Sequence, residues 1–341
     1  MLSAPAILGF LRGKTSGGFH PPVFHLHWPL LSVWLGRRAL MKRNVAAFSF
    51  LAAVLTVARP SANTANGAPA STPNDQAAVL VGAGDIADCT DLSGAEATAK
   101  LLEAIPGTVM AVGDLAYPDG TQANFACYDK TWGRVKARTR PAVGNHEFHS
   151  TGATYYFSYF GPAAGDATKG YFSYELGVWH VIVLNSECAA VGGCEQGSKE
   201  EQWLRSDLAS HHAACTLAYF HKPLFSSGGT HGDAAEFRAF WQALYEAHAD
   251  VVVNGHDHDY ERFAPQTPLA KPDAARGIRE FVVGTGGKSH RPFAPPHANS
   301  EVRNTDTFGV LKLTLRPGAY DWQFIPEAGK TFTDSGTGSC H

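Results

Sequence analysis

The sequence predicts an α/β fold with mixed strands, in which two sheets form a sandwich flanked by helices. Two observations support this prediction. Short apolar runs that end at Gly or Asn alternate with stretches whose apolar residues recur at helical spacing, which gives a βαβαβ order at the start of the domain. Many further strand-like runs lie in the second half of the chain, so we expect the sheet to be mixed and doubled.

The individual elements follow from these patterns. Buried strands are expected where the apolar runs are continuous, at residues 77–83, 108–112 and 251–254. Helices are expected at residues 94–105, 198–211 and 233–248. Further strands are expected at residues 172–176, 178–185, 216–220, 279–283, 308–315 and 320–325.

Composition limits the domain count and the kinds of partner. The 341 residues are 44% hydrophobic and 17% charged, which is enough to bury the core of one large domain or two small ones. The formal net charge is −3 and no long Lys/Arg run occurs in the sequence. We therefore expect a small-molecule partner, with no nucleic acid polymer and no stable membrane partner, and composition leaves the oligomeric state open.

The first part of the chain has the order of a secretory signal peptide. Met41, Lys42 and Arg43 precede an apolar run at 45–58, and small residues at 68–70 offer a cleavage site. The run is shorter than the ~20 residues that span a bilayer. We expect a non-native or unprocessed leader at 1–40, a signal peptide at 41–70, a linker at 71–77 and one folded domain at 78–341, secreted or periplasmic after cleavage.

The cysteines fit an oxidising compartment because their number, six, is even. Cys188 and Cys194 bracket a segment of small residues and suit a tight loop. The remaining cysteines would then pair as Cys89 with Cys127 and Cys215 with Cys340, although the sequence does not choose among the fifteen connectivities. The spacing of a zinc knuckle is absent from the sequence.

Polar side chains follow the predicted strands where loops converge in α/β proteins. They offer carboxylate, amide and imidazole ligands: Asp85, Asp114, Asn145, His146, His221, His256 and His258. Each is weak evidence alone, since an Asp after a strand often caps a helix. His256 and His258 would share a site only if the chain bends, and Gly255 permits a bend.

Two nucleotide-binding patterns offer other interpretations of the same region. Gly82, Gly84 and Ala87 fit the GxGxxA form of a dinucleotide loop, but no clean helix start and no acidic residue at the end of a second strand accompany them. Residues 284–289 are similar to the end of a P-loop. Val282 stands where that loop needs Gly, so the segment predicts a turn near the rim of the site.

Five ordered motifs together are far more specific than any one. GD stands at 84–85, GDLAY at 113–117, GNHE at 144–147, a lone His at 221 and GHDH at 255–258, with Tyr260, Glu261 and Arg262 after them. Between residues 78 and 325 the chain resembles the calcineurin-like metallophosphoesterases and, within them, the bacterial-type purple acid phosphatases, as a catalytic domain alone. The resemblance implies the metallophosphoesterase double-sheet sandwich. One position departs from the pattern, since Ala218 stands where the family often has Val.

The resemblance also implies a dinuclear metal centre bridged by Asp114. Asp85, Tyr117 and His258 would complete one metal site, and Asn145, His221 and His256 the other. A phenolate and carboxylates suit Fe(III), whereas imidazoles and an amide suit a divalent ion, so we expect Fe(III) with Zn(II), Fe(II) or Mn(II).

The function implied is an exported phosphatase that hydrolyses phosphate monoesters with a metal-bound hydroxide and has an acidic pH optimum. Asp114 and His146 would be catalytic, His146 and His231 would contact the substrate, and Glu147 would orient His146. The alternatives are a phosphodiesterase of the same fold and a non-catalytic metal-binding protein.

Overall fold

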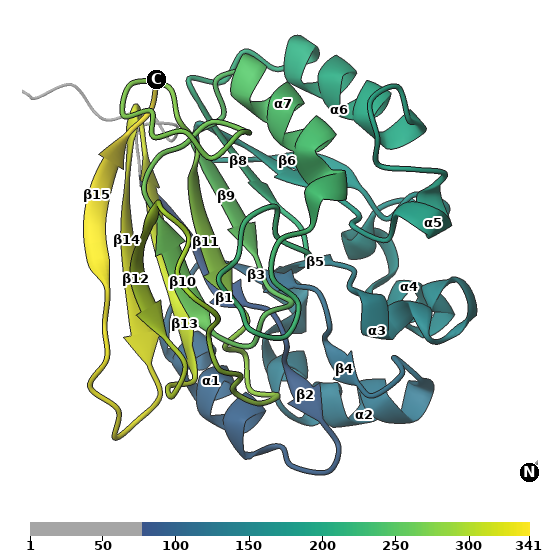
Figure 1. The fold of residues 1–341 in the computed structure, drawn as a ribbon. Coiled ribbons are helices and arrows are strands. Elements are labelled where there is room, and N and C mark those ends of the chain that lie inside the picture. The colour runs from purple at the N-terminus through teal and green to yellow at the C-terminus, as the bar shows by residue number, and fades with distance from the viewer. Residues whose placement is uncertain (1–76) are drawn as a thin grey trace, which may run out of the picture. The chain divides into compact units, whose positions relative to one another are not determined.

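The computed structural model describes residues 77–341. The expected leader at 1–40, the signal peptide at 41–70 and all but the last residue of the linker lie outside the described residues. Within 77–341, the chain forms two large sheets that pack face to face, with helices around them (Figure 1).

The first sheet has six strands in the order β15-β14-β13-β1-β3-β5. Its parallel half consists of β1 (Ala78–Ala83), β3 (Thr108–Val112) and β5 (Thr139–Ala142). Its antiparallel half consists of β13 (Gly309–Arg316), β14 (Ala319–Pro326) and β15 (Ser335–Ser339). The sheet is therefore mixed, as expected from the sequence.

The second sheet has seven strands in the order β12-β10-β11-β9-β8-β7-β6. The strands β7 (Trp179–Val183), β8 (Cys215–Tyr219), β9 (Val251–Asn254) and β11 (Arg279–Val283) run parallel to one another. The strands β6 (Phe172–Leu176), β10 (Tyr260–Phe263) and β12 (Ser300–Asn304) are antiparallel to their neighbours. A small parallel pair, β2 (Ala87–Asp88) and β4 (Ala116–Tyr117), lies apart from both sheets.

The side chains of the second sheet contribute to two hydrophobic cores, one on each face of the sheet. Val181 and Val183 face the first sheet, whereas Ile182 and Leu184 face the helices on the outer side. Successive side chains of a strand point to opposite faces, so a continuous apolar run is required wherever both faces are buried. This explains why β7, β8 and β9 are apolar throughout and were visible in the sequence as strands.

Seven α-helices and four 3₁₀ helices cover these sheets in the described part of the chain. The α-helices are α1 (Ser93–Ala104), α2 (Gln122–Lys130), α3 (Asn145–Phe148), α4 (Thr154–Phe160), α5 (Cys188–Val191), α6 (Lys199–Ser210) and α7 (Arg238–Glu246). The 3₁₀ helices are η2 (Trp132–Arg138), η3 (Thr151–Ala153), η4 (Gly161–Ala164) and η5 (Ala235–Phe237). None of the helices in 77–341 is long and apolar enough to span a bilayer.

The predicted α/β sandwich is confirmed, but the boundaries and several elements differ. The helix expected at 233–248 is divided into η5 and the shorter α7. The strands β10, β12 and β15 were not predicted from hydrophobic pattern. β12 and β15 consist mainly of polar residues and glycine and lie at sheet edges, where only one neighbour and little burial are needed.

Three disulfides occur in the described part of the chain, two between distant segments and one within a short loop. Cys89 pairs with Cys127, Cys188 with Cys194, and Cys215 with Cys340. They include the tight loop expected for Cys188 and Cys194, and the remaining cysteines form the two other pairs named from the sequence. The third closes the longest loop, with a sequence separation of 125 residues, and joins β8 to the segment after β15.

Candidate metal centre

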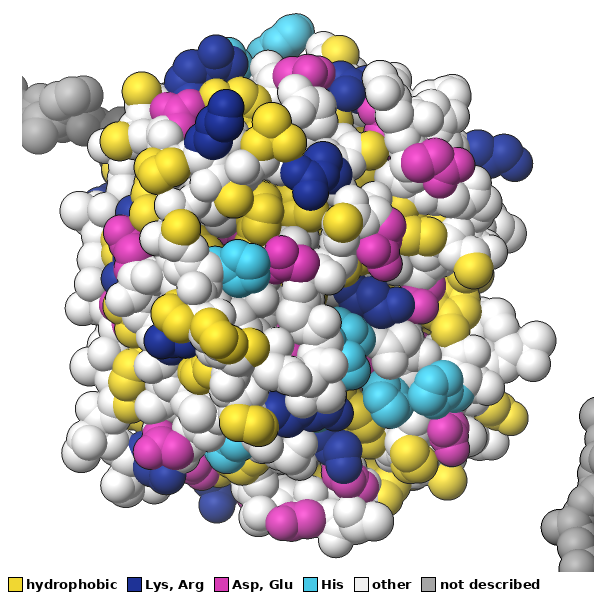
Figure 2. Space-filling view, viewed as in Figure 1, with side chains coloured by type: hydrophobic (Ala, Val, Ile, Leu, Met, Phe, Trp, Pro, Cys, Tyr) yellow, Lys and Arg dark blue, Asp and Glu magenta, His cyan; other side chains and the backbone are white. Residues whose placement is uncertain are grey.

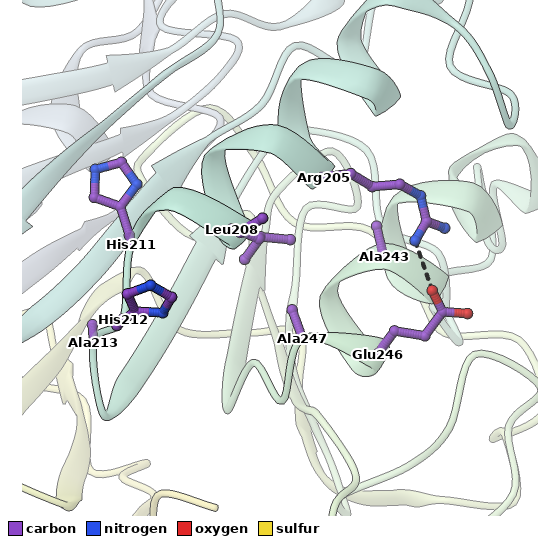
Figure 3. Close-up of a pocket in the computed structure, with 9 residues that line it drawn as sticks. Arg205, Leu208, His211, His212, Ala213, Ala243, Glu246 and Ala247 are labelled. Atoms are coloured by element: carbon purple, nitrogen blue, oxygen red, sulfur yellow. Dashed lines mark hydrogen bonds and ion pairs between the residues drawn. The ribbon is translucent and has the colours of Figure 1, made fainter. Parts of the chain in front are cut away.

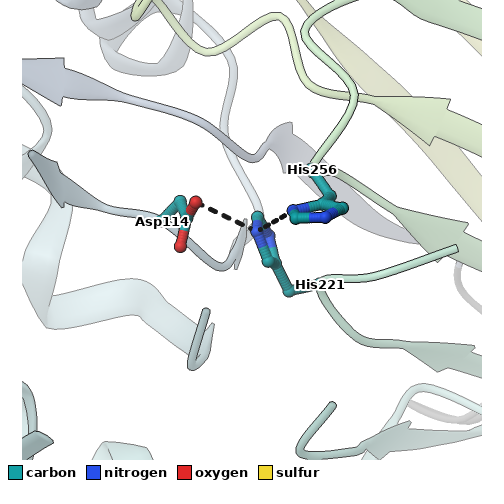
Figure 4. Close-up of side chains that lie close together, drawn as sticks. All are labelled: Asp114, His221 and His256. Atoms are coloured by element: carbon teal, nitrogen blue, oxygen red, sulfur yellow. Dashed lines mark hydrogen bonds and ion pairs between the residues drawn. The ribbon is translucent and has the colours of Figure 1, made fainter. Parts of the chain in front are cut away.

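The polar residues after the parallel strands converge at the carboxyl ends of both sheets. Asp85 follows β1 and Asp114 follows β3, while His221 and His256 follow β8 and β9 in the second sheet. Figure 4 shows three of these side chains, Asp114, His221 and His256, pointing toward one another. The structure brings together six of the seven predicted ligand side chains: Asp85, Asp114, Tyr117, His221, His256 and His258. The seventh, Asn145, directly precedes His146, whose backbone N–H donates to Asp114 Oδ1.

Backbone conformation aims several of these residues into the site. Asp85, Asp114 and His256 have φ values of 60°, 53° and 73°, in the left-handed region that non-glycine residues seldom adopt. The bend that lets His256 and His258 share one site is thus at His256 itself. Gly255 is needed for space, because a Cβ there would lie 2.7 Å from Asp85 Oδ2. Gly255 thus permits the bend, as expected from the sequence, by leaving room for Asp85 rather than by adopting a left-handed conformation itself.

One group of donor atoms surrounds the hydroxyl of Tyr117. This oxygen lies 2.8 Å from Asp85 Oδ1, 3.1 Å from Asp114 Oδ2 and 3.2 Å from His258 Nε2. His258 Nε2 is also 3.3 Å from Asp85 Oδ1. The four side chains are buried.

A second group lies on the other side of Asp114. Asp114 Oδ2 is 3.1 Å from His221 Nε2, which in turn is 3.1 Å from His256 Nδ1. Asn145 Oδ1 is buried and has no hydrogen-bond partner among the described residues. Because an unpaired buried amide oxygen is unfavourable, this atom requires a partner that protein side chains do not supply.

These distances test whether metal ions fit the two groups. Two donors that are each ~2.1 Å from one ion and at right angles to each other are about 3.0 Å apart. The observed separations within each group lie near this value. The donor set, with carboxylates, imidazoles, a phenol and an amide oxygen, therefore fits metal ions in both its geometry and its chemistry.

Neighbouring groups fix the orientation of the histidine rings. His221 Nδ1 lies 2.9 Å from Val112 O, and His258 Nδ1 lies 2.7 Å from Ser289 Oγ. A hydrogen bond at one ring nitrogen leaves the other nitrogen available as a ligand, which is the usual arrangement around protein-bound metals.

The centre is rich in negative charge. Burial disfavours an ionised Asp114, but the imidazoles of His221 and His146 hold the pKa of Asp114 well below its usual range. Burial lowers the pKa of His221, yet the Asp114 carboxylate outweighs this effect and raises it to about 10. Burial and the charges of Asp114 and Asp85 raise the pKa of Tyr117. This is the electrostatic setting in which a cation binds.

Glu147 supports the loop of Asp114 rather than the ring of His146. Its carboxylate accepts hydrogen bonds from the backbone N–H groups of Gly144, Asp114, Leu115 and Ala116, at 2.9, 3.0, 2.8 and 3.2 Å. The His146 ring is held instead by Pro118 O, 2.5 Å from its Nδ1. The expectation that Glu147 orients His146 is therefore corrected, because its four contacts fix backbone.

The two predicted substrate-contacting histidines lie at the edge of the donor groups. His146 Nε2 is 3.7 Å from Asp114 Oδ2, and its side chain is 24% exposed. The His231 ring stacks on His256 with centroids 4.0 Å apart, and its Nε2 contacts the guanidinium of Arg291. Burial and the charge of Arg291 lower the pKa of His231.

Several residues around the centre were not identified from the sequence. Lys288 lies 5.2 Å from the centre of the Tyr117 ring, and Ser289 contacts His258. Arg291 contacts His231 from the same loop. The expected turn at 284–289 does lie beside the site, since Lys288 N donates to Asp85 O. Figure 2 shows histidines gathered with Lys and Arg side chains on one face, over the region of β4 and α3.

Known proteins resemble this chain in sequence and fold. Purple acid phosphatase 21 of Arabidopsis thaliana is 29% identical over 224 residues, which cover 60% of this chain and 49% of that protein. Purple acid phosphatase 15 of the same plant is 24% identical over 295 residues, covering 76% and 54%. The chain thus spans about half the length of these curated relatives.

A solved structure shows the same fold. Purple acid phosphatase PPD1 from yellow lupin (Lupinus luteus) seeds superposes with a TM-score of 0.65 at 19% identity, covering 79% of this chain and 55% of that one. The family described as calcineurin-like phosphoesterase matches residues 72–260, more than half of the chain. On this match, the chain belongs to the calcineurin-like phosphoesterases.

Proposed function

We propose that this protein is an exported phosphatase that hydrolyses phosphate monoesters at a dinuclear metal centre. One observation carries the proposal: Asp114 Oδ2 lies 3.1 Å from the Tyr117 hydroxyl and 3.1 Å from His221 Nε2. A single carboxylate thus touches both donor groups, which is the position of a ligand shared by two ions. Family membership and the purple acid phosphatase relatives support the same function.

The residues that would hold the ions divide into two groups around the shared Asp114: Asp85, Tyr117 and His258 on one side, and Asn145, His221 and His256 on the other. Two bound ions would supply the Lewis acidity that lowers the pKa of water and offsets charge on the phosphate oxygens. The phenol and carboxylates favour Fe(III) in the first group, and the imidazoles and amide favour Zn(II), Fe(II) or Mn(II) in the second.

His146 is suited to move a proton at the leaving group. If the ring donates from Nδ1 to Pro118 O, the Nε2 atom faces Asp114 and the space in front of the centre. A proton held on Nε2 is then available to the oxygen of the departing alcohol. His231 and its neighbour Arg291 lie beside His256, where they would contact the phosphate or the rest of the substrate.

The proposed acidic pH optimum depends on the proposed Fe(III) ion. The phenol and carboxylates of the first group would hold Fe(III), whose chemistry would lower the pKa of water more than that of a divalent ion and would favour activity below neutral pH. Export is supported by the order of residues 41–70 and by the three disulfides. N-terminal sequencing of the mature protein should find a start near residues 68–70, and an intact residue 41 would refute cleavage.

Substituting Asp114 tests the centre itself. Asp114→Asn should lower hydrolysis of p-nitrophenyl phosphate at least a hundredfold and reduce the metal content, because a shared negative ligand is lost. The matched control is Asp166→Asn, which makes the same chemical change at an exposed residue beside Lys169. Near-normal turnover with full metal content in the Asp114 variant would contradict the shared ligand.

Spectroscopy and substrate choice test the finer claims. Metal analysis should find iron, and a visible phenolate-to-Fe(III) band should disappear in Tyr117→Phe. A colourless wild-type protein that contains only zinc or manganese would refute the Fe(III) assignment. Faster hydrolysis of bis(p-nitrophenyl) phosphate than of the monoester would favour a phosphodiesterase, and no hydrolysis by the metal-loaded protein would favour a binding role.

A further inference from the structure

A second cluster of metal-binding side chains lies at the other end of the seven-stranded sheet. His180 is the second residue of β7, which runs parallel to β8, whereas the candidate centre follows the carboxyl end of β8. Glu175 in β6 is the direct cross-strand partner of His180. His211 follows α6, and one donor atom from each of these three residues lies within 4.8 Å of the others.

The His180 ring is buried beside the carboxylate of Asp207. It is 1% exposed, and neither ring nitrogen has a partner of acceptable geometry among residues 77–341. Its Nε2 is 2.9 Å from Asp207 Oδ2, yet the two atoms are not aligned as a hydrogen bond. The Asp207 carboxylate therefore lies close enough to His180 to support this ring electrostatically. Burial of an unpaired imidazole is otherwise unfavourable.

One ring nitrogen of His211 is held by a backbone carbonyl, as is usual for a histidine that binds a metal ion. Its Nδ1 lies 2.8 Å from Asp207 O, one helical turn earlier, so an N–H at that atom leaves Nε2 with a free lone pair. The His180 and His211 rings are stacked, with centroids 4.2 Å apart and planes 22° apart. The in-plane lone pairs of stacked rings do not meet at one point, so binding of an ion requires the exposed His211 side chain to rotate out of the stack, while His180 is held by burial.

The cluster is open to solvent through the surface around His211. Glu175 and His211 line a pocket with Gly177 and Gly318. His211 also lines the neighbouring pocket of Figure 3, where it lies at the far end from the ion pair of Arg205 and Glu246. An ion therefore has an entry path from solvent, and water can complete its coordination.

We propose that Glu175, His180 and His211 bind a Zn(II) ion, with Asp207 beside His180, and that this ion fixes the end of α6 to the β6–β7 hairpin. Two imidazoles and one or two carboxylates are the donors that Zn(II) takes in proteins, with four-coordinate geometry. The site is separate from the candidate catalytic centre and does not depend on the proposed function.

Zinc titration of the full-length protein with its catalytic centre filled tests this site. The wild type should bind one more Zn(II) per chain than His211→Ala or Glu175→Gln, as measured by calorimetry and by metal analysis after gel filtration. Zinc should raise the melting temperature of the wild type and leave those of the two variants unchanged. Both substitutions are at exposed residues, and circular dichroism verifies that the variants are folded.

His212→Ala is the matched control, because it removes the adjacent histidine, which lies outside the cluster. This variant should retain the additional zinc ion and the thermal shift. The proposal is overturned if the wild type binds no zinc beyond its catalytic centre, or if His211→Ala retains the additional ion. Equal losses in His211→Ala and His212→Ala would also overturn it, since they would indicate a surface histidine pair. Phosphatase activity should be the same in all three variants.

Discussion

At the scale of single residues, Asp114 is held by several contacts within the candidate centre. Its Oδ2 contacts the Tyr117 hydroxyl and His221, while its Oδ1 accepts a hydrogen bond from His146 N at 2.8 Å. Its backbone N–H donates to Glu147. A carboxylate held from so many directions has one available position, which preorganises it for a shared ligand role.

His146 should affect chemistry more than metal binding. Replacing it by Ala should lower turnover by about 10²–10⁴-fold, the usual contribution of a positioned proton donor. The loss should be largest for alkyl phosphates, whose leaving groups are poor, and smallest for p-nitrophenyl phosphate. Steady-state kinetics and metal analysis measure both effects.

The control for this prediction is His149→Ala. The two rings are neighbours, with centroids 4.7 Å apart, and His149 Nδ1 also lies near Pro118 O, at 3.2 Å. His149 makes no close contact with Asp114 among the described residues, so its removal should change turnover little. Equal losses for good and poor leaving groups in His146→Ala would argue against the proton-donor role.

Asp250 should make stability depend on pH. Burial raises the pKa of this carboxyl from 3.8 to about 7, and hydrogen bonds from Thr216 N and His341 N offset only part of that effect. The pKa of Asp250 is higher in the folded state than in the unfolded state. Asp250 therefore contributes its full stability below pH 3.8, and this contribution is lost as pH rises through about 7. The contribution is on the order of 1.4 kcal/mol per pKa unit.

Asp250→Asn removes this titration. The free energy of unfolding should then fall less between pH 4 and pH 7 than it does in the wild type, as measured by urea denaturation. An identical pH dependence in the two proteins would show that Asp250 has an ordinary pKa in the folded state.

At the scale of elements, hydrophobic pattern identified those strands and helices that bury apolar side chains. β7, β8 and β9 bury both faces, so their composition alone indicated strands. β12 and β15 are edge strands, each held by backbone pairing with one neighbouring strand, and composition does not reveal this pairing. The same limit applied to α2, whose apolar residues form no clear stripe.

In the candidate site too, local motifs predicted some features, whereas others depend on tertiary packing. Each predicted ligand position lies in a short motif beside a strand end, which a sequence displays directly. The contacts of Glu147 with four backbone N–H groups, and of Ser289 with His258, depend on how separate loops pack against each other. No local pattern encodes such contacts, so the role of Glu147 was predicted incorrectly.

The packing of α6 on the second sheet should contribute strongly to stability. Leu204 is fully buried between the helices and the outer face of that sheet, so Leu204→Ala should lower the free energy of unfolding by about 2–5 kcal/mol. Leu269 is 60% exposed, and Leu269→Ala is the matched control, with an expected change within about 0.5 kcal/mol. Urea denaturation of both variants measures the difference, and equal changes would contradict this account of the core.

At the scale of the whole molecule, the disulfides should differ in their effect on stability. The bridge between Cys215 and Cys340 spans 125 residues, whereas that between Cys188 and Cys194 spans 6. Chain entropy predicts that removing the long bridge costs about 5 kcal/mol and removing the short one about 2 kcal/mol. Double Cys→Ala variants, compared by urea denaturation, test this order, and a larger loss from the short bridge would contradict it.

The candidate centre draws its donors from both layers of the sandwich. Asp85 and Asp114 follow strands of one sheet, while His221 and His256 follow strands of the other. Neither layer by itself contains a complete set for the proposed ions. Ions bound at the proposed centre would therefore connect the two sheets to each other, so their removal by a chelator should lower the free energy of unfolding of the whole domain.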